Sequence, residues 1–509
     1  MVGNACLTET LKRLDLMKES KAYRTAIKLP KGGRGSLESK TRFETFNQLN
    51  EEFNFREFDL HNWVTANLTH SWLNSDGHLD ASTMMAIASR EFKIVQGYSF
   101  SKRGRPHFLR KGTFNCIDGR SNSGVKWKKD HIDWFGLKGI KAVIDPNDKV
   151  TAHGLSHRIK HVQLVRRQVG SKLRYYAQLV CEGLPYIKES NLPGHGVVGL
   201  DLGPSTIAVV APQAGVALLE EFCSELDDKQ ETIRQLQRQE DRQRRSNNPN
   251  NYNPDGTIRK GSKKWVISKR QTKVSLQRSS IQRKQAAHRK SLQGNLVNRI
   301  LTLGDDIRTE KVSYRSFQKN FGRSVGYRAP GMFMAELRRK ASKVTEFSTR
   351  TTRLSQTCHG CGTIEKKSLS QRWHSCDCGL KSQRDLYSAF LATCVEGDQL
   401  NVGQALKTWP EVDKLLQATL SGKESEIGKG RELPTSFGLR NRSQIGSPVS
   451  AGQETVAPEI LDVVEPACGE REPGKGCEPY QPVTDLSTHR ERPGASKRQP
   501  KGNQQLRFF

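Results

Sequence analysis

Four closely spaced cysteines constrain the fold of this chain more than any other feature of its sequence. They fall within 21 residues, as two pairs separated by fourteen residues: Cys358, Cys361, Cys376 and Cys378. Two short glycine-containing knuckles at this separation supply four soft ligands for a tetrahedral zinc ion. The second pair has one residue between its thiols instead of two, which leaves His374 or His359 as an alternative ligand. The pattern predicts a zinc ribbon over residues 357–380 that holds one structural zinc ion.

The charge balance points to a polyanionic partner. The 509 residues carry 83 Lys+Arg against 53 Asp+Glu, a formal net charge of +30, and the usual polyanion at this scale is nucleic acid. No apolar run approaches the roughly 18 residues of a membrane span, and the segment 1–14 lacks an apolar signal core. We therefore expect nucleic acid as a partner, no membrane association and a cytoplasmic location.

Half of the excess charge lies in one segment. Residues 229–300 hold 19 Lys+Arg and 4 Asp+Glu, and neither flank of the segment contains proline. The flanks 230–245 and 274–300 are typical of helices joined by the turn-rich loop 246–256. Fifteen uncompensated positive charges repel one another, so we favour a helical hairpin that faces nucleic acid over a merely solvated one.

The part of the chain before residue 193 shows two kinds of sequence pattern, one helical and one typical of β-strands. Residues 22–29 alternate like a strand that ends at Pro30, and residues 37–98 are mostly helical in pattern. The segments 159–167 and 173–181 flank a glycine-containing turn and predict a β-hairpin. We expect a β-rich domain over 1–36 and 112–192, with a helical insert over 37–111.

Basic and aromatic residues alternate in the segments 101–111 and 126–129, as suits phosphate contact combined with base stacking. A solvated loop is the alternative interpretation. The candidate nucleic-acid contacts are Lys102, Arg103, Arg105, Lys126 and Lys128. By contrast, residues 421–509 hold 9 of the 20 prolines and show no sustained period, which predicts a disordered tail.

Three acidic residues stand where regular elements begin or end. Asp201 closes an apolar strand and is followed by a Gly-Pro turn and a second strand, the opening hairpin of RNase H-like folds. A carboxylate among buried residues costs several kcal/mol unless it is paired or bound to a metal. Glu310 ends a weak strand, with Asp305 or Asp306 as alternatives, and Asp385 opens the helix that follows the cysteine cluster.

Together these motifs resemble those of the TnpB proteins of insertion sequences and of their relatives, the compact type V CRISPR effectors. Gly199-Leu-Asp201-Leu-Gly resembles the first nuclease motif, Thr309-Glu310-Lys311 the second, and Arg384-Asp385-Leu-Tyr-Ser-Ala the third. The resemblance covers residues 194–395 by motif and residues 22–190 only in texture.

The resemblance implies an α/β multidomain protein with an RNase H-like (RuvC-type) nuclease domain interrupted by the zinc ribbon and the helical hairpin. The β-rich domain would be the family's β-barrel-like wedge domain, and its helical insert a recognition domain. The implied parts are nuclease 193–356 (with the hairpin 229–300), zinc ribbon 357–380, nuclease 381–420 and tail 421–509.

The resemblance further implies that Asp201, Glu310 and Asp385 are catalytic acids that hold two Mg²⁺ ions, while the cysteines hold one Zn²⁺. The partners would be a guide RNA and double-stranded target DNA in a prokaryotic cytoplasm, close to the nucleoid. The expected activity is cleavage of DNA next to a short flanking motif. The alternatives are a non-cleaving regulator of transposition and a CRISPR effector; a transposase fits the position of the ribbon poorly.

Overall fold

The computed structural model describes residues 1–439 except 34, 70, 72–78, 111, 121–123, 227, 262 and 369. The chain forms two compact units of mixed α/β structure. Unit 1 comprises Met1–Glu189 and Asp227–Ala286, and unit 2 comprises Ser190–Leu226 together with the described residues from Ala287 onward. None of the helices in the described residues combines the length and apolar character that a membrane span requires.

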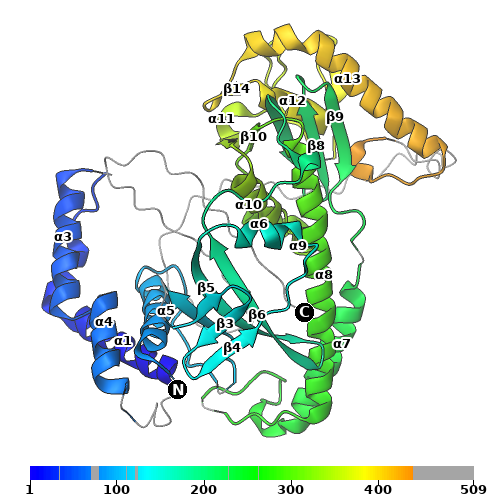
Figure 1. The fold of residues 1–509 in the computed structure, drawn as a ribbon. Helices are drawn as coiled ribbons and strands as arrows, with labels where there is room; N and C mark the ends of the chain where they lie inside the picture. The colour runs from blue at the N-terminus through cyan, green and yellow to red at the C-terminus, as the bar shows by residue number, and fades with distance from the viewer. Residues whose placement is uncertain are drawn as a thin grey trace. The chain divides into compact units, whose positions relative to one another are not determined.

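Unit 1 opens with helices that share one hydrophobic core (Figure 1). They are α1 (Val2–Glu19), α2 (Lys21–Lys28), α3 (Leu37–Glu52), α4 (Glu57–Leu68) and α5 (Ala81–Ser99). Leu7 and Leu14 from α1 meet Leu60 from α4 and Met84 from α5 in this core, and all four side chains are almost fully buried. The helical pattern predicted for residues 37–98 is confirmed by α3, α4 and α5.

The strand predicted over residues 22–29 is wrong, because this segment is the helix α2. The Ser20 hydroxyl accepts a hydrogen bond from the Tyr23 backbone N–H at 3.1 Å and caps the helix. Ala26 is buried, and the Tyr23 ring packs edge-on against Phe46. The β-rich character predicted for residues 1–36 is wrong for the same reason, since α1 and α2 belong to the helical core.

Two small sheets follow in unit 1. One has the order β1 (Cys116–Arg120), β5 (Ile159–Val169), β6 (Lys172–Cys181), and the other has β2 (Lys126–Lys128), β3 (His131–Trp134), β4 (Leu137–Lys141). The short helix α6 (Lys149–Leu155) lies between β4 and β5 along the chain. The predicted hairpin is confirmed, because β5 and β6 pair antiparallel around a turn at Gly170 and Ser171.

The predicted helical hairpin is also confirmed. It consists of α7 (Gln230–Asn247) and the long α8 (Lys269–Leu301), and α8 continues from unit 1 into unit 2. Within unit 1 the Arg278 guanidinium on α8 donates to the Glu240 carboxylate on α7 at 3.0 Å. Leu236 and Val274, on the same two helices, are buried.

Unit 2 is built on a sheet whose described strands have the order β11-β10-β7-β8-β9. Figure 1 labels β8, β9 and β10 of this sheet. The bounds of the sheet's strands are β7 (Val197–Leu202), β8 (Thr206–Ala211), β9 (Val216–Glu221), β10 (Asp306–Glu310) and β11 (Lys343–Phe347). The first three strands pair antiparallel, whereas β10 is parallel to both β7 and β11. The central strand is therefore β7, the strand that carries Asp201.

Both faces of this sheet are covered. On one face Val198, Leu200 and Leu202 of β7 pack with Val297 and Ile300 of α8 and with α10 (Pro330–Lys340). On the other face, Ala208 and Val210 of β8 pack with α12 (Arg384–Thr393) and α13 (Val402–Gly428). The remaining elements are α9 (Tyr314–Arg328), α11 (Thr349–Thr352), β12 (Trp373–Ser375), β13 (Lys381–Gln383), β14 (Val395–Glu396) and β15 (Gln399–Leu400).

The prediction of disorder from residue 421 is wrong for residues 421–439. Helix α13 continues to Gly428, and Leu433 and Phe437 are buried in the core around α12. The Trp373 indole N–H also donates to the Gly438 carbonyl at 3.0 Å. These few apolar anchors hold a segment whose average composition resembles that of a linker. The rest of the predicted tail, 440–509, lies outside the described residues.

Candidate active site and metal centre

Asp201 lies on the central strand of the unit 2 sheet. Alternation along β7 puts Val198, Leu200 and Leu202 on one face of the sheet, so Gly199 and Asp201 share the opposite face. Asp201 pairs with Ala208 of β8. The carboxylate is thus fixed on a strand that is hydrogen-bonded on both sides, on the face that α12 covers.

Gly199 lets α12 approach the sheet more closely than any side chain would allow. A Cβ atom at this position would lie 1.9 Å from the Ala389 carbonyl oxygen of α12. Asp385 precedes Ala389 by four helical residues, about 6 Å of rise, and Asp201 follows Gly199 by two strand residues, about 6.6 Å. The contact at Gly199 therefore sets the first turn of α12 beside Asp201.

Glu310 is the last residue of β10, next to β7. The parallel pairing of the two strands ends at Thr309 with Leu200, so Glu310 and Asp201 each follow the last pair by one residue. The Glu310 carboxylate accepts a hydrogen bond from the Leu354 backbone N–H. This places two carboxylates at corresponding positions on adjacent parallel strands.

Asp385 stands in the first turn of α12, where the helix dipole favours a negative charge. The Gln383 side chain caps this helix by accepting a hydrogen bond from the Leu386 backbone N–H at 2.8 Å. The Arg384 guanidinium lies 3.6 Å from an Asp385 oxygen and donates to the Ser368 carbonyl at 3.0 Å. The start of α12 is therefore attached to the segment that contains the cysteines.

The pKa values of all three carboxyl groups are raised. Burial raises the pKa of Asp201 well above its ordinary value, and the nearby Asp385 and Glu310 carboxylates raise it further. Burial also raises the pKa values of Glu310 and Asp385. Arg384 and Arg372 lower the pKa values of both Asp201 and Asp385 and so offset part of the repulsion. The site has an excess of negative charge in a poorly solvated place, the condition that a bound cation relieves.

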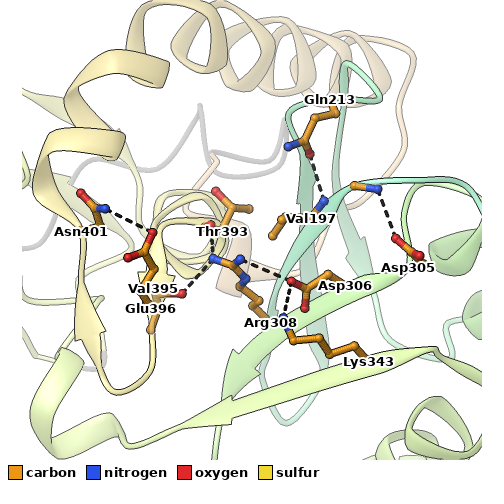
Figure 2. A network of polar contacts seen from close by, with 11 residues as sticks. Val197, Gln213, Asp305, Asp306, Arg308, Lys343, Thr393, Val395, Glu396 and Asn401 are labelled. Atoms are coloured by element: carbon orange, nitrogen blue, oxygen red, sulfur yellow. Dashed lines mark hydrogen bonds and ion pairs between the residues drawn. The ribbon is translucent and has the colours of Figure 1, made fainter.

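Asp305 and Asp306, the alternative second acids, lie at the opposite end of β10 (Figure 2). Asp306 pairs with Val197 at the start of β7, four residues or about 13 Å from Glu310 along the strand. Its carboxylate accepts from Lys343 at 2.9 Å and from Arg308 at 3.3 Å, while Asp305 accepts from the Gly196 backbone N–H. The structure therefore brings Glu310, and neither of these two residues, towards Asp201.

Arg308 connects β10 to the far end of α12 (Figure 2). Its guanidinium donates to the Thr393 and Val395 carbonyl oxygens, each at 2.8 Å. A cation at a helix C-terminus satisfies carbonyl groups that have no partner within the helix and interacts favourably with the dipole. Helix α12 is thus held at its start by Gln383 and Arg384 and at its end by Arg308.

The four cysteines form the ligand cluster that their spacing predicts. Their sulfur atoms all lie within 4.8 Å of one another, and no other group of this kind occurs in the described residues. The closest pairs join the two knuckles, Cys358 to Cys378 at 3.5 Å and Cys361 to Cys376 at 3.4 Å. Four Zn–S bonds of about 2.3 Å in a tetrahedron require sulfur separations of about 3.8 Å, so the cluster fits zinc.

His359 and His374, the alternative ligands, lie outside this sulfur cluster. Both rings are buried and pack against the fully buried Tyr387 of α12; the His374 ring stacks on it at 4.5 Å. The Tyr387 hydroxyl accepts from the His359 backbone N–H at 3.0 Å and lies 2.7 Å from His359 Nδ1. The histidines therefore connect the cysteine knuckles to the helix that carries Asp385.

The basic residues predicted to contact nucleic acid are all exposed in unit 1. Lys126 and Lys128 share one face of β2, because they are two residues apart on a strand. Lys102 lies over the ring of the exposed Phe100 at 5.8 Å, whereas Arg105 is paired with Asp15 at 3.0 Å. The charge of Arg105 is therefore already compensated.

Sequence reasoning missed Gly199 as a packing residue, Tyr387 as the contact to the ribbon, and Arg372 and Arg384 as the cations beside the acids. Arg384 and Tyr387 are adjacent to Asp385 in the third motif, and a basic residue beside a helix-start carboxylate is a usable signal. Arg372 lies thirteen residues before Asp385, and no local pattern connects them.

Comparison with known proteins shows distant structural likenesses. No family model and no curated protein matches the sequence. The chain is similar to a chain of the structure titled "Cryo-EM structure of the Cas12f1-sgRNA-target DNA complex", with 11% identity, 76% of this chain and 94% of that chain covered, and a TM-score of 0.33. A chain of "Cryo-EM structure of CRISPR-Cas12f Ternary Complex" is 11% identical over 77% and 95% of the two chains, with a TM-score of 0.22. At these scores neither likeness assigns a function to the chain.

Proposed function

We propose that this protein is an RNA-guided DNA endonuclease whose nuclease domain is the RNase H-like (RuvC-type) fold of unit 2. The observation that carries the proposal is the electrostatic coupling of Asp201 with Asp385 and Glu310, three acids from distant parts of the chain. A buried carboxyl group whose pKa is raised by burial and by neighbouring acids is typical of functional sites and is costly where it serves no purpose.

The strand arrangement of unit 2 supports the RNase H-like fold. Three antiparallel strands, β7, β8 and β9, are followed by β10 and β11, which run parallel to β7. The first acid stands on the central strand, the second at the end of the neighbouring parallel strand, and the third on the helix that crosses them. This order matches the opening hairpin and split acidic motifs expected from the sequence.

The acids suit magnesium, because carboxylate oxygens are the ligands that Mg²⁺ prefers. Two Mg²⁺ ions bound by these carboxylates would supply an attacking hydroxide and stabilise the leaving oxygen of a phosphodiester. Asp201 on its rigid strand would hold the centre of the site. Glu310, fixed by the Leu354 backbone N–H, and Asp385, fixed by the capped start of α12, would complete the ligand set.

The thiols of the ribbon would hold one structural zinc ion, and the ribbon in turn would position α12. Arg384 and Tyr387, on either side of Asp385 in the chain, both contact ribbon residues. Arg372 and Arg384 would keep the negative charge of the site within the range that a phosphate backbone tolerates.

The net charge of +30 supports nucleic-acid partners. We propose a guide RNA, encoded by a transposable element or a related locus, and double-stranded target DNA next to a short flanking motif. In such a division of labour the protein reads the flanking motif and base pairing reads the remaining sequence.

The decisive experiment is to purify the protein with its co-expressed RNA and assay cleavage of a DNA library with randomised flanks in the presence of Mg²⁺. We expect cleavage next to one motif, and a loss of at least about 10²-fold in Asp201→Asn, with the RNA retained. Glu310→Gln should lose activity to a similar extent.

Asp305→Asn is the matched control, since it changes the same charge at the opposite end of β10. Cleavage retained in Glu310→Gln and lost in Asp305→Asn would overturn the assignment of the second acid. Binding without cleavage in the wild type would instead favour a regulator of transposition, and cleavage that survives removal of the RNA would favour a nuclease without a guide.

A further inference from the structure

The part of α8 that belongs to unit 1 has two different faces. Gln271 and Val274 are buried, and Arg278 is paired with Glu240 of α7, so one face packs against its partner helix. A second stripe along the helix carries Lys269, Lys273 and Lys284, and all three are exposed. These positions are four and eleven residues apart, which keeps them on one side of a helix. In the described part of the chain none of the three lysines has a carboxylate partner within 4.0 Å.

The second stripe of α8 forms one wall of a groove of about 560 Å³. Its opposite wall is Gly170 and Ser171, the turn of the β5–β6 hairpin. Leu276 and Ile281 lie between the lysines, and none of the lining residues is acidic. The groove is therefore an open channel with a partly apolar floor and a basic rim.

The hairpin adds further positive charge beside this turn. Arg167 of β5 and Arg174 of β6 are directly opposite in the antiparallel register, and Lys172 is opposite Val169. Like charges at opposed positions destabilise a β-ladder. All three basic side chains are exposed, and no ion pair of theirs with an acid occurs in the described residues. The Arg167 guanidinium lies over the Tyr176 ring at 5.6 Å, a contact that leaves its positive charge in place.

The positive charges at the start of α8 are also electrostatically unfavourable. Lys269 and Arg270 occupy its first two positions and no acid stands in its first turn, although a helix N-terminus favours negative charge. An anion along the groove would relieve the repulsion at both walls. The distance from Lys269 to Lys284 is fifteen residues, or about 22 Å of helix, roughly six nucleotide rises along one strand of a duplex.

We propose that this groove binds the phosphate backbone of a nucleic acid. Lys269, Lys273 and Lys284 lie on one side, and on the other lies the turn at Gly170 and Ser171, which the basic residues Arg167, Lys172 and Arg174 flank along the hairpin. The inference depends on the proposed function only for the presence of a nucleic-acid partner, because phosphate contact here requires none of the three acids of unit 2. The guide RNA and the target DNA present the same chemistry, and the experiment below distinguishes them.

The test compares wild-type protein with the triple variant Lys269→Ala/Lys273→Ala/Lys284→Ala. The probes are short labelled duplexes of RNA and of DNA and the matching single strands, measured in EDTA between about 50 and 200 mM salt. The slope of log K against log salt should decrease in magnitude by about 2 to 3, since each lost phosphate contact contributes about 0.7 to 0.9. Loss for RNA alone assigns the groove to the guide, and loss for duplex DNA alone assigns it to the target.

The matched control is Lys407→Ala/Lys414→Ala/Lys429→Ala, which removes the same charge from exposed positions on and just after α13 in unit 2. We expect its slope to change by less than about 1. Equal effects of the two triple variants, or no effect of the groove variant on any probe, would overturn the proposal. Because cleavage is not measured, failure of the nuclease assignment leaves this result interpretable.

A single variant keeps the proposal testable if the triple variant does not fold. Arg174→Gln removes the opposed pair with Arg167, so it should leave the thermal midpoint unchanged or raise it by about 1 °C. The same variant should weaken binding of the nucleic acid that the triple variant loses, by about two- to fivefold at low salt. A lower midpoint together with unchanged binding would show that Arg174 has a purely structural role, which contradicts the proposal.

Discussion

Unit 2 contains two groups of candidate metal ligands, four thiols and three carboxylates, and the fold brings each group together in a different way. The four thiols come from two knuckles of one short segment, and their sulfur atoms lie within 4.8 Å of one another. The three carboxylates come from β7, β10 and α12; Asp385 and Glu310 raise the pKa of Asp201, but the three groups do not form so tight a cluster. The thiol cluster depends mainly on local chain geometry, whereas the carboxylate cluster depends on how a helix packs on a sheet. Perturbing each should therefore have different consequences.

The largest effect is expected from Cys376→Ser. Structural zinc contributes about 10–16 kcal/mol of apparent binding free energy in small zinc-binding domains, so losing one thiolate should release the ion and unfold the ribbon. Metal analysis should give one zinc per wild-type molecule and none in the variant. Cys116→Ser, which changes a cysteine of unit 1, should retain the full equivalent. A variant at position 376 that keeps its zinc would contradict the four-thiolate assignment.

The Cys376→Ser substitution should also affect the position of Asp385. The Arg384 backbone N–H donates to the Arg372 carbonyl at 2.9 Å, so the start of α12 is bonded to the ribbon. Unfolding of the ribbon would release the turn that carries Asp385. The thiol cluster thus helps to hold the carboxylates in place. We expect no effect in the other direction, so a change at the carboxylate site should leave the zinc site intact.

Gly199→Ala tests the reverse direction. The new methyl group would lie 1.9 Å from the Ala389 carbonyl oxygen, so α12 must move away from β7. Overpacking of this kind costs about 1–3 kcal/mol and occasionally more. We expect a clear decrease in thermal midpoint and a loss of DNA cleavage, while the zinc content stays at one equivalent.

Gly294→Ala is the control for this substitution, because a Cβ at position 294 of α8 meets no atom within 4 Å. An alanine in the middle of a helix should raise stability by up to about 1 kcal/mol. Equal behaviour of the two variants in thermal unfolding would contradict the packing of α12 on Gly199.

Tyr387→Phe tests the connection between the two clusters. The substitution keeps the ring contacts with His359 and His374 but leaves the buried His359 backbone N–H without its partner. An unsatisfied buried donor costs about 1–3 kcal/mol. Zinc release to a colorimetric chelator should become several-fold faster than in the wild type. An unchanged release rate would show that the Tyr387 contact does not stabilise the ribbon.

The smallest effect is a dependence of stability on pH. Without magnesium, the folded state keeps protons on Asp201, Glu310 and Asp385 at pH values where the unfolded chain releases them. The contribution of these groups to stability is therefore present below the ordinary carboxyl pKa of about 4 and decreases as the pH rises towards the raised values. In magnesium-free buffer the thermal midpoint of Asp201→Asn should decrease less than that of the wild type between about pH 5 and pH 8. A steeper decrease in the variant would contradict the raised pKa values.

The sequence predicted the four-cysteine cluster, because ligand spacing in a short segment determines its geometry, but it left His359 and His374 open as alternative ligands. It also predicted the hairpins β5–β6, β7–β8 and α7–α8, where turn residues separate regular patterns. It failed at α2, where an alternating pattern also suits a capped helix with one buried alanine. It failed again at residues 421–439, where Leu433 and Phe437 anchor a segment of linker-like composition.

For the carboxylates, the sequence predicted the residues through a family resemblance, but it could not show that they lie close together in the fold. The choice between Glu310 and Asp305 or Asp306 required the register of β10 against β7, which no local pattern contains. The role of Gly199 required the position of α12, nearly two hundred residues later in the chain. Contacts of this kind follow from tertiary packing and are not encoded in any short window.

The central claim is that Asp201, Glu310 and Asp385 share divalent cations. Its most direct test is titration of magnesium-free, zinc-retaining protein with Mn²⁺, followed by electron paramagnetic resonance. The account predicts about two bound ions per molecule, close enough for their spins to couple, and affinity reduced by at least about tenfold in Asp201→Asn. The absence of bound Mn²⁺, or equal binding by the wild type and Asp201→Asn, would contradict it.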